Sequence, residues 1–551
     1  MSKKFLKLIS FCTVLSLVFS LLIGCAKKEA DQTTASTTQT SSSQSSTSQP
    51  AEANASVYPL KTDVTLTWWL EPDANVTANF KNIGDTVFGQ ELQKRTGVKI
   101  EFLHPVAGQA QETMNLMIAS RDMPDIMEYL WGSYYNGGAE LAMENKIILP
   151  LNDLIKQYAP NLTKCLNEIK DLEKLAKTDS GRIYSFPTVN PLDMQIATYG
   201  PVIRGDWLEE LNLPVPKTMD DWYNALKAFK EKKGATAPFS YYDPVRMRPF
   251  GRGVFSSAYG INVGWYKDDG NKIKYGPMEP GFKDFLVTMS QWYKDGLLDN
   301  NFAMNDLRSM EANILNGKTA AILCYPGSGI GKYNPLMQEK DPKARFVPTT
   351  YPVLKEGDKL KICVTTAPYA TSAVISATCK NPEIAAQLLD YGYTEEGSLL
   401  CNFGIDGVSF KMDNGYPTML DEVLKNPGKL PIEQAWAKYS RGTYGGPFIR
   451  SRAEIDQYYQ LQEQRDALKL WTENSNTDYF LPELSPLTEE VSEFGKIMSD
   501  VNTALNEYSV QVIMGSQSID GFDKFVEQIK KMNIEKAIQI QQAALDRYNS
   551  R

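Results

Sequence analysis

Histidine is almost absent from this chain, since His104 is the only one among 551 residues. Zinc sites that need two or three histidines are therefore excluded. A Ser-His-Asp or Cys-His catalytic arrangement would have to use His104, which ends a strand-like run just before Pro105. A single histidine in that position favours a structural role. We expect no metal site and no cofactor.

Cysteine is also scarce. Cys12 and Cys25 lie in or next to an N-terminal apolar run, and the other five are odd in number and widely spaced. This spacing does not fit a disulfide framework or a paired zinc pattern. We interpret most of these side chains as small, buried and apolar. The sequence leaves open whether any of them pair: Cys165, Cys324, Cys363, Cys379 and Cys401.

Positive charge is limited as well. The formal net charge is −8 and no basic cluster stands out, so nucleic-acid binding is not expected. The glycine-rich segment "YPGSGIGKYN" (325–334) fits neither the P-loop spacing nor the G-x-S-x-G motif. It predicts a turn from a strand into a loop, with backbone N–H groups that face a ligand. The 66 acidic residues leave paired carboxylates open, so a glycoside hydrolase or polysaccharide lyase stays as the enzymatic alternative.

Only one long apolar run is present, from Leu8 to Ile23, and three lysines precede it. The run is shorter than the roughly 20 residues that a membrane-spanning helix needs, and its layout is that of a secretory signal. Its end, Leu22-Ile23-Gly24-Cys25, resembles the bacterial lipobox. That resemblance implies cleavage before Cys25 and a diacylglyceryl group on its sulfur. Loss of the three lysines takes the net charge from −8 to −11.

A polar stretch follows Cys25. Residues 31–56 are mostly Ser, Thr, Gln, Ala and Asn, with too little apolar surface to offset the entropy of ordering. We therefore expect a lipidated N-terminus and a flexible tether over residues 25–60. Such a tether would hold a globular part just outside a membrane.

Strand-like and helical runs alternate in the rest of the chain. "VTLTWWL" (64–70) and "VKIEFLH" (98–104) predict strands with a helix ending at Gly97 between them. "ETMNLMIASRDMPDIMEYL" (112–130) predicts a helix, a break and a buried strand. This alternation is typical of an α/β fold with a parallel sheet. The length exceeds what one core normally holds, which predicts two lobes.

Helix ends are clearest in the middle of the chain. Thr218 as N-cap, Asp221 three residues later and Gly234 as a stop predict one helix. Asn381 followed by Pro382 predicts the start of another. From Glu454 to the C-terminus the pattern is mostly that of long helices.

Several segments, in order, resemble the extracellular solute-binding lipoproteins of Gram-positive carbohydrate ABC importers, in the branch of maltodextrin-type and large oligosaccharide binders. The resemblance runs from about Val64 to the C-terminus. It is carried by "ASRDMPDIMEYLWGSYYNGGAELAMENKIILPLNDLI", "DSGRIYSFPTVN", "VIRGDWLEELNLPVPKTMDDWYNALKAFKEK" and "VIMGSQSIDGFDKFVEQI". Some large members carry a calcium loop where this chain reads "KEKKGATAPFSYYDP", without alternating Asp or Asn ligands. Calcium binding is therefore not carried over.

The resemblance implies a two-lobed α/β fold of the periplasmic-binding-protein type II class, with hinge crossovers and a helical C-terminal region. Hinge motion near residues 197, 371 and 432 would close the lobes on a ligand. The implied division is a signal peptide over 1–24, the tether over 25–60, the first lobe over 61–197 and 372–432, and the second lobe over 198–371 and 433–551.

The same resemblance implies a non-enzymatic, monomeric protein held by its lipid on the outer face of the membrane of a Gram-positive bacterium. It would bind an oligosaccharide and deliver it to the permease subunits of an ABC importer. Three alternatives stay open: a peptide ligand, a polysaccharide-degrading enzyme, and a sensor-associated binder that feeds no transporter.

Sugar sites combine flat aromatic rings with polar side chains, and this chain has nine Trp and 28 Tyr. Trp131 and Tyr325 each follow a strand-like run, where maltodextrin-type binders place a stacking ring. Core packing is the alternative for every ring, and it is the preferred interpretation of Trp207, as a structural hydrogen bond is of Asp206. Arg204 lies near a lobe crossover and Asp406 in a glycine-flanked turn. The predicted ligand-binding residues are Trp69, Trp131, Arg204, Trp265, Tyr325, Asp406 and Trp436.

Overall fold

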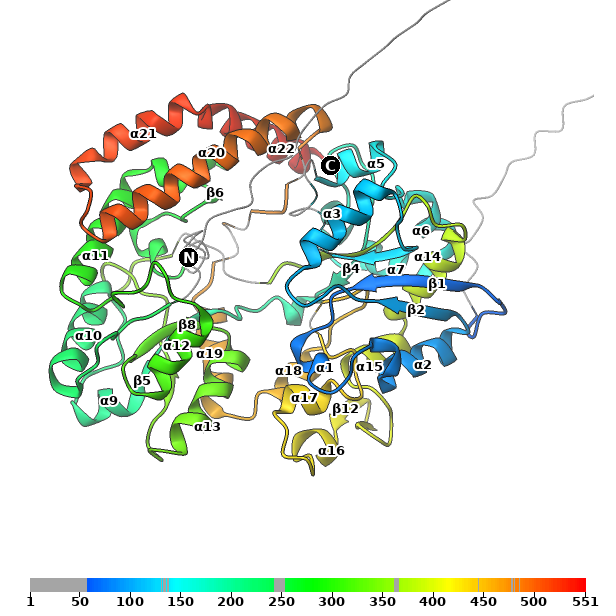
Figure 1. Cartoon of the computed structure of the whole chain (residues 1–551), viewed down its shortest axis with the longest axis horizontal. Helices are drawn as coiled ribbons and strands as arrows, with labels where there is room; N and C mark the ends of the chain where they lie inside the picture. The colour runs from blue at the N-terminus through cyan, green and yellow to red at the C-terminus, as the bar shows by residue number, and fades with distance from the viewer. Residues whose placement is uncertain are drawn as a thin grey trace, which may run out of the picture. The chain divides into compact units, whose positions relative to one another are not determined.

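The computed structural model of the chain describes residues 57–129, 131, 135, 138–241, 253–360, 366–443, 445–476, 479, 481–484 and 486–551 (Figure 1). The predicted signal, Cys25, residues 25–56 of the predicted tether, and Cys363 lie outside these ranges. No helix within them is long and apolar enough to cross a membrane.

A five-stranded sheet with the order β2-β1-β3-β10-β4 forms the first of two main sheets. Strand β1 (Thr65–Leu70) pairs in parallel with β2 (Lys99–Leu103) and β3 (Ile126–Glu128), which confirms the predicted strands. Strand β10 (Tyr369–Ile375) is antiparallel to β3 and to β4 (Phe186–Val189). The sheet is therefore mixed rather than parallel, because β10 enters it after the chain has built the second sheet.

Polar side chains tie the strands of this first sheet to the segments beside them. The Asp125 carboxylate accepts hydrogen bonds from the backbone N–H and the hydroxyl of Thr67, both at 2.9 Å, which ties the break before β3 to β1. His104 lies 2.9 Å from the Leu70 carbonyl through Nδ1 and accepts from the Ile83 N–H at 3.1 Å through Nε2. The predicted structural role of His104 is thereby confirmed.

The second sheet has the order β8-β5-β9, and both of its pairs are antiparallel. It consists of β5 (Gly200–Arg204), β8 (Ala321–Cys324) and β9 (Phe346–Pro348). Helix α10 (Met219–Lys233) beside it carries the predicted capping box between Thr218 and Asp221 and ends at Gly234 in the left-handed conformation. Local sequence signals therefore set this helix at both ends.

The segment after β8 differs from the prediction. Residues 325–334 were expected to turn into a loop, but Pro326–Gly331 form a π-helix that continues into α13 (Lys332–Gln338). Gly329 lies so close to β8 that a Cβ there would be 2.2 Å from Cys324 Sγ, so this position requires glycine. The glycines serve backbone packing at this point.

Each main sheet belongs to a separate hydrophobic core, and we call the two resulting parts the first lobe and the second lobe. The other main elements of the first lobe are α2 (Val87–Thr96), α3 (Ala110–Ser120), α5 (Gly138–Glu144), α6 (Asn152–Tyr158), α7 (Pro160–Glu168), α8 (Leu172–Ala176), α14 (Pro382–Asp390), α15 (Glu395–Asn402), β11 (Phe410–Asp413), β12 (Tyr416–Met419), α16 (Asp421–Leu424) and α17 (Ile432–Trp436). Those of the second lobe are α9 (Gly205–Glu210), β6 (Trp265–Lys267), β7 (Ile273–Tyr275), α11 (Pro280–Lys294) and α12 (Leu307–Leu315).

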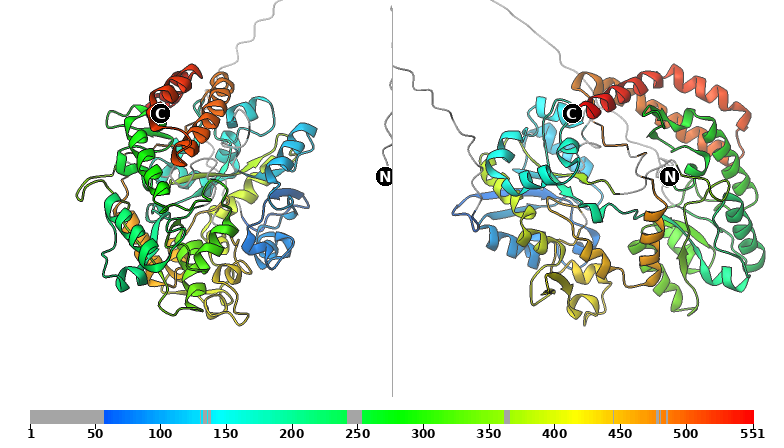
Figure 2. Two further views of the ribbon diagram at one scale, coloured as in Figure 1. Left: turned by 60° about the vertical axis from the view of Figure 1, so that its left-hand side comes forward. Right: turned by 180° about the vertical axis from the view of Figure 1, so that it is seen from behind.

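The C-terminal region is mostly helical, as predicted. It contains α18 (Arg452–Tyr458), α19 (Gln462–Glu473), α20 (Thr488–Ile513), α21 (Phe522–Lys531) and α22 (Ile534–Ser550). Helix α20 packs against α11 and α22, and Figure 2 shows this arrangement from two further directions. Val501, Ile529 and Ala537 belong to the second-lobe core. The last three helices are therefore part of the second lobe.

The chain passes between the two cores three times. It leaves the first lobe after β4, returns with β10, and leaves again before α19. Ala437 and Phe448, beyond the predicted boundary at residue 432, pack in the first-lobe core. Cys165, Cys324, Cys379 and Cys401 are free, and burial raises the pKa of the Cys324 thiol to about 12. These four cysteines therefore act as apolar side chains rather than as reactive thiols.

Candidate functional site

The first lobe carries a group of four aromatic side chains where β1 and β3 end. The Trp69 ring lies 5.7 Å from that of Tyr129 in an edge-on arrangement, and the rings of Trp131 and Tyr135 lie 6.0 Å apart. Trp69 and Trp131 are buried among apolar side chains that include Met127, whereas the two tyrosines are half-buried. We call these four residues the first-lobe aromatic group.

Both indoles of this group hold an unused hydrogen-bond donor. The Nε1 atoms of Trp69 and Trp131 are buried, and each lacks a hydrogen-bond partner in the part of the chain that the structure describes. A buried donor without a partner typically costs about 1–3 kcal/mol. The two donors therefore reduce stability unless another molecule supplies acceptors.

A buried ion pair underlies the end of β3. The Arg441 guanidinium bonds the Glu128 carboxylate and, through Nε, the Gly445 carbonyl at 3.1 Å. It also lies 5.6 Å from the centroid of the Trp68 ring. Burial lowers the pKa of Arg441, but the groups around it, with the Glu128 carboxylate foremost, raise it, and the net shift is upward. Arg441 therefore stays charged and fixes Glu128 beside the aromatic group.

Sequence reasoning missed this pair. Glu128 and Arg441 are 313 positions apart, and no local signal links them. The loop that carries Arg441 is held to β4 by two hydrogen bonds between Thr188 and Gly446, each 2.8 Å. Tyr444, another loop aromatic, lies outside the described residues.

The second lobe presents a smaller aromatic pair. Tyr325 directly follows β8, and its side chain is 40% exposed. Its ring packs edge-on against that of Tyr199, with the centroids 5.0 Å apart. We call these two residues the second-lobe aromatic pair. As predicted, Trp131 and Tyr325 follow strands of different lobes and precede glycine-containing segments.

The predicted residue Arg204 is engaged inside the second lobe. It is buried, and its Nε donates to Asp206 at 2.8 Å. Its guanidinium lies 4.2 Å from the ring centroid of Trp207, which is also buried. Packing and hydrogen bonding of Trp207 and Asp206 agree with their predicted structural roles. Arg204 thus braces the start of α9 in this structure.

The remaining predicted residues lie in three different settings. Trp436 is buried, and its indole donates to the Asn402 carbonyl at 2.6 Å. Trp265 is half-buried and packs against Tyr275 at 4.8 Å. Asp406 is exposed in the turn before β11. None of these three side chains belongs to the first-lobe aromatic group or to the second-lobe aromatic pair, so their contact with a ligand stays a prediction.

Within the described residues, neither a metal-binding cluster nor the second-lobe pocket involves the predicted ligand-binding residues. In the described ranges, no three His, Cys, Asp or Glu side chains come together as metal ligands would. A pocket of about 510 Å³ lies in the second lobe between α9, β9 and α19, and it is lined in part by Leu208, Val347 and Leu470. None of the predicted ligand-binding residues lines it.

Comparison with known proteins places these features in a family. A family described as "Bacterial extracellular solute-binding protein" matches residues 74–398. The fructooligosaccharide ABC transporter substrate-binding protein FusA of Streptococcus pneumoniae is 25% identical, over 90% of this chain and 92% of FusA. Lipoprotein LipO of Bacillus subtilis is 24% identical, over 80% of this chain and 85% of LipO.

Solved structures show the same fold. The crystal structure of the alginate-binding protein AlgQ2 without calcium ion superposes with a TM-score of 0.73 and 24% identity. The match covers 90% of this chain and all of that one. The arrangement of two α/β lobes therefore extends over nearly the whole described chain.

Proposed function

Because the chain belongs to the bacterial extracellular solute-binding protein family, we propose that it captures an oligosaccharide between its two lobes and delivers it to the permease of an ABC importer. FusA is named for fructooligosaccharides and AlgQ2 for alginate, and both are carbohydrate ligands. The similarity to these proteins supports a sugar rather than a peptide ligand.

The observation that carries the proposal is the presence of aromatic side chains at strand ends in both lobes. In open α/β sheets, ligands bind beyond the carboxyl ends of the strands. The first-lobe aromatic group lies where β1 and β3 end, and Tyr325 follows the end of β8, whereas its neighbour Tyr199 directly precedes β5, which is antiparallel to β8. Sugar rings have apolar faces that stack on aromatic side chains, and their hydroxyls accept hydrogen bonds. The Nε1 donors of Trp69 and Trp131, which have no hydrogen-bond partner among the described residues, match that second requirement.

Lobe closure would bring the two sets of rings onto one ligand. The three segments that pass between the cores are the hinges in this proposal, with the third beginning after Phe448. Ligand binding then favours the closed arrangement, because only that arrangement uses the contacts of both lobes. A permease can distinguish loaded from empty protein by this change.

Membrane attachment through Cys25 completes the proposal. Its support is the lipobox-like sequence before Cys25 and the similarity to a protein named Lipoprotein LipO. Cys25→Ala is expected to release the protein from membranes or to leave the precursor uncut. Membrane-bound protein of mature size in that variant would contradict the anchor.

Titration calorimetry with a ligand panel tests the function. The panel should contain fructooligosaccharides, alginate oligosaccharides, polygalacturonan fragments and short peptides. We expect at least one oligosaccharide to bind and no new reducing ends to form during incubation. Binding of peptides alone would contradict the sugar assignment, and new reducing ends would indicate an enzyme.

A further inference from the structure

Helices α20 and α22 form an arm that is rooted in the second lobe. The two helices pack against one another, and Val501 of α20 and Ala537 of α22 belong to the second-lobe core. The Ile273 N–H of β7 donates to Gln542 Oε1 of α22 at 2.8 Å. With 17 residues, α22 is about 25 Å long, and its last turn lies beyond these second-lobe contacts.

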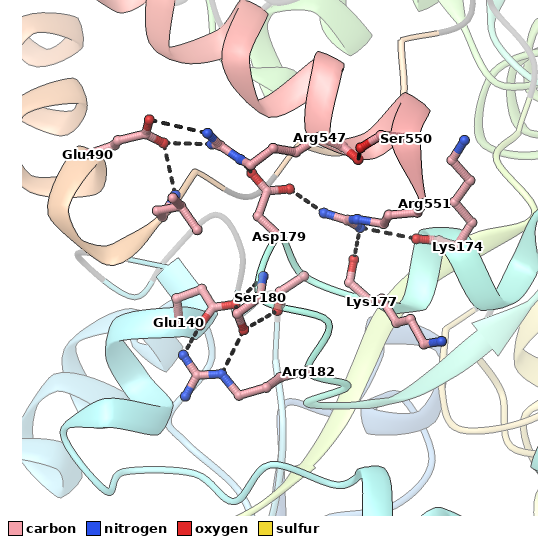
Figure 3. A network of polar contacts seen from close by, with 12 residues as sticks. Glu140, Lys174, Lys177, Asp179, Ser180, Arg182, Glu490, Arg547, Ser550 and Arg551 are labelled. Atoms are coloured by element: carbon pink, nitrogen blue, oxygen red, sulfur yellow. Dashed lines mark hydrogen bonds and ion pairs between the residues drawn. The ribbon is translucent and has the colours of Figure 1, made fainter.

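The tip of this arm binds the first lobe through charged side chains (Figure 3). Arg547 Nε bonds Asp179 Oδ2 at 2.6 Å, and the Arg551 guanidinium bonds Asp179 Oδ1. Arg547 also bonds Glu490, near the start of α20, at 2.7 Å. The Lys174 ammonium lies 4.4 Å from the ring centroid of Tyr548. The Arg547–Glu490 bond thus joins the last turn of α22 to the first turn of α20, and both turns form the tip of the arm.

The receiving surface belongs to the first lobe. Asp179 lies in the loop 177–182, whose C-terminal end is held by Asn152: the Asn152 amide donates to the Gly181 carbonyl at 3.1 Å, and the Ile183 N–H donates to Asn152 Oδ1 at 3.0 Å. The side chain of Asp179 is only 1% exposed. A carboxylate this buried needs its cationic partners, because an unpaired buried charge is strongly unfavourable. The contact between the lobes is thus an integral part of the packing.

Helix α5 connects this surface to the first-lobe aromatic group. The buried Glu140 of α5 accepts from the Ser180 hydroxyl at 2.6 Å and pairs with Arg182, which fixes the loop to the helix (Figure 3). Thr488 at the start of α20 donates to Glu144 of α5 at 2.7 Å. In sequence, α5 is the next described helix after Trp131. The arm therefore contacts the element that follows the candidate ligand residues.

We propose that the α20–α22 tip is a latch, a non-covalent connection between the lobes that restricts their hinge motion in the ligand-free protein. The three chain crossings alone would leave the lobes free to open and close. Contacts of Asp179 with Arg547 and Arg551 oppose any motion that separates the tip from loop 177–182. The role of this motion in ligand capture rests on the proposed function, but the latch itself acts without ligand.

Distance measurements between the lobes test the latch in the full folded protein. Spin labels on exposed Lys425 of the first lobe and Lys232 of the second would report the distribution of lobe separations without ligand. Asp179→Asn and the double variant Arg547→Gln/Arg551→Gln remove the ion pairs of the latch from opposite sides, and the Thr488–Glu144 bond and the Lys174–Tyr548 contact remain. Each variant is expected to shift or broaden the distribution by more than its width in the unaltered protein.

Arg182→Gln is the matched control. It breaks ion pairs of the same loop, but both partners, Glu140 and Glu144, belong to the first lobe, and the Thr488–Glu144 bond to the arm is kept. The distribution should stay as in the unaltered protein. An unchanged distribution in the folded double variant would overturn the latch, as would an equal change in Arg182→Gln. If Asp179→Asn fails to fold, the double variant still tests the latch. Both arginines are partly exposed, so the fold should tolerate their replacement. No ligand is present, so failure here leaves the proposed function untouched.

Discussion

The two lobes present their candidate ligand rings in different ways. In the first lobe, Trp69 and Trp131 are buried in a core and only the two tyrosines reach solvent, whereas Tyr325 of the second lobe stands 40% exposed on Tyr199. The buried rings of the first-lobe aromatic group are therefore held in place before any ligand binds, and they also stabilise the fold. Because Tyr325 is the more exposed ring, its removal should cost the fold less than the removal of a buried first-lobe ring. A ring of the first kind cannot be assigned to binding by removing it, because its loss also alters the protein without ligand.

Trp131→Ala should give the largest effect, and the effect should be on stability. Its side chain is fully buried, and large-to-small changes of aromatic core residues cost on the order of 3–5 kcal/mol. Urea denaturation without ligand measures the loss. A change below about 1 kcal/mol would mean that Trp131 is not a core residue, and the contrast between the lobes would be lost.

Tyr325→Ala should instead reduce ligand affinity and spare stability. A ring covered by a ligand contributes on the order of 1.5–3 kcal/mol by area, which is roughly tenfold or more in the dissociation constant. The free energy of unfolding should change by no more than about 0.5 kcal/mol. Tyr416→Ala is a matched control, because this tyrosine is 45% exposed on β12 of the first lobe, outside both aromatic sets. Equal affinity losses in the two variants would refute the role of Tyr325.

Glu454 lies in the chain segment between the lobes and should make stability depend on pH. Its carboxyl is buried, and desolvation raises its pKa from 4.5 to about 7, against the opposing effect of Arg450 at 3.9 Å. An acid with a raised pKa in the folded state stabilises the fold below its unfolded pKa. That contribution is lost as the pH rises through about 7.

Between pH 5 and pH 8 the loss should be on the order of 2 kcal/mol. Glu454→Gln cannot ionise and should therefore show a flatter dependence of unfolding free energy on pH. Thermal or urea unfolding at several pH values measures this. Parallel pH profiles for the two proteins would show that Glu454 does not titrate in this range.

Chelation should give the smallest effect, namely none on affinity. The chain lacks alternating acidic ligands after α10, and no metal-binding cluster occurs in the described ranges. Calorimetric titration before and after treatment with a chelator provides the comparison. A loss of binding that added calcium restores would contradict this expectation and would reveal a site formed by residues beyond those ranges.

Local chemistry made much of the fold predictable. The strands 65–70 and 99–103 follow from alternating apolar residues, and α10 follows from Thr218, Asp221 and Gly234. Each signal lies within the element that it determines. The aromatic positions Trp131 and Tyr325 were found in the same way, from the strands that precede them.

The parts that were missed depend on distant partners. The pairs Glu128–Arg441 and Asp179–Arg547 join residues 313 and 368 positions apart, and only the folded chain brings them together. Arg204 is a different case, because Asp206, the partner that engages it, stands two residues away in the sequence. A search for such near neighbours would have shown its carboxylate partner. The hydrogen bond of Trp436 could not be predicted, because its acceptor is a backbone carbonyl, which no sequence pattern marks.

The most direct test of the account replaces Trp131 by Phe, which keeps a buried ring and removes the unpartnered N–H. Trp222→Phe is the control, since Trp222 of the second-lobe core is equally buried and its Nε1 likewise lacks a partner among the described residues. Calorimetric titration with the oligosaccharide that binds the unaltered protein best is the measurement. We predict a loss of affinity of about fivefold for Trp131→Phe, equivalent to one hydrogen bond of about 1 kcal/mol, and none for Trp222→Phe. Unchanged affinity in Trp131→Phe, or an equal loss in both variants, would contradict the claim that this indole serves the ligand.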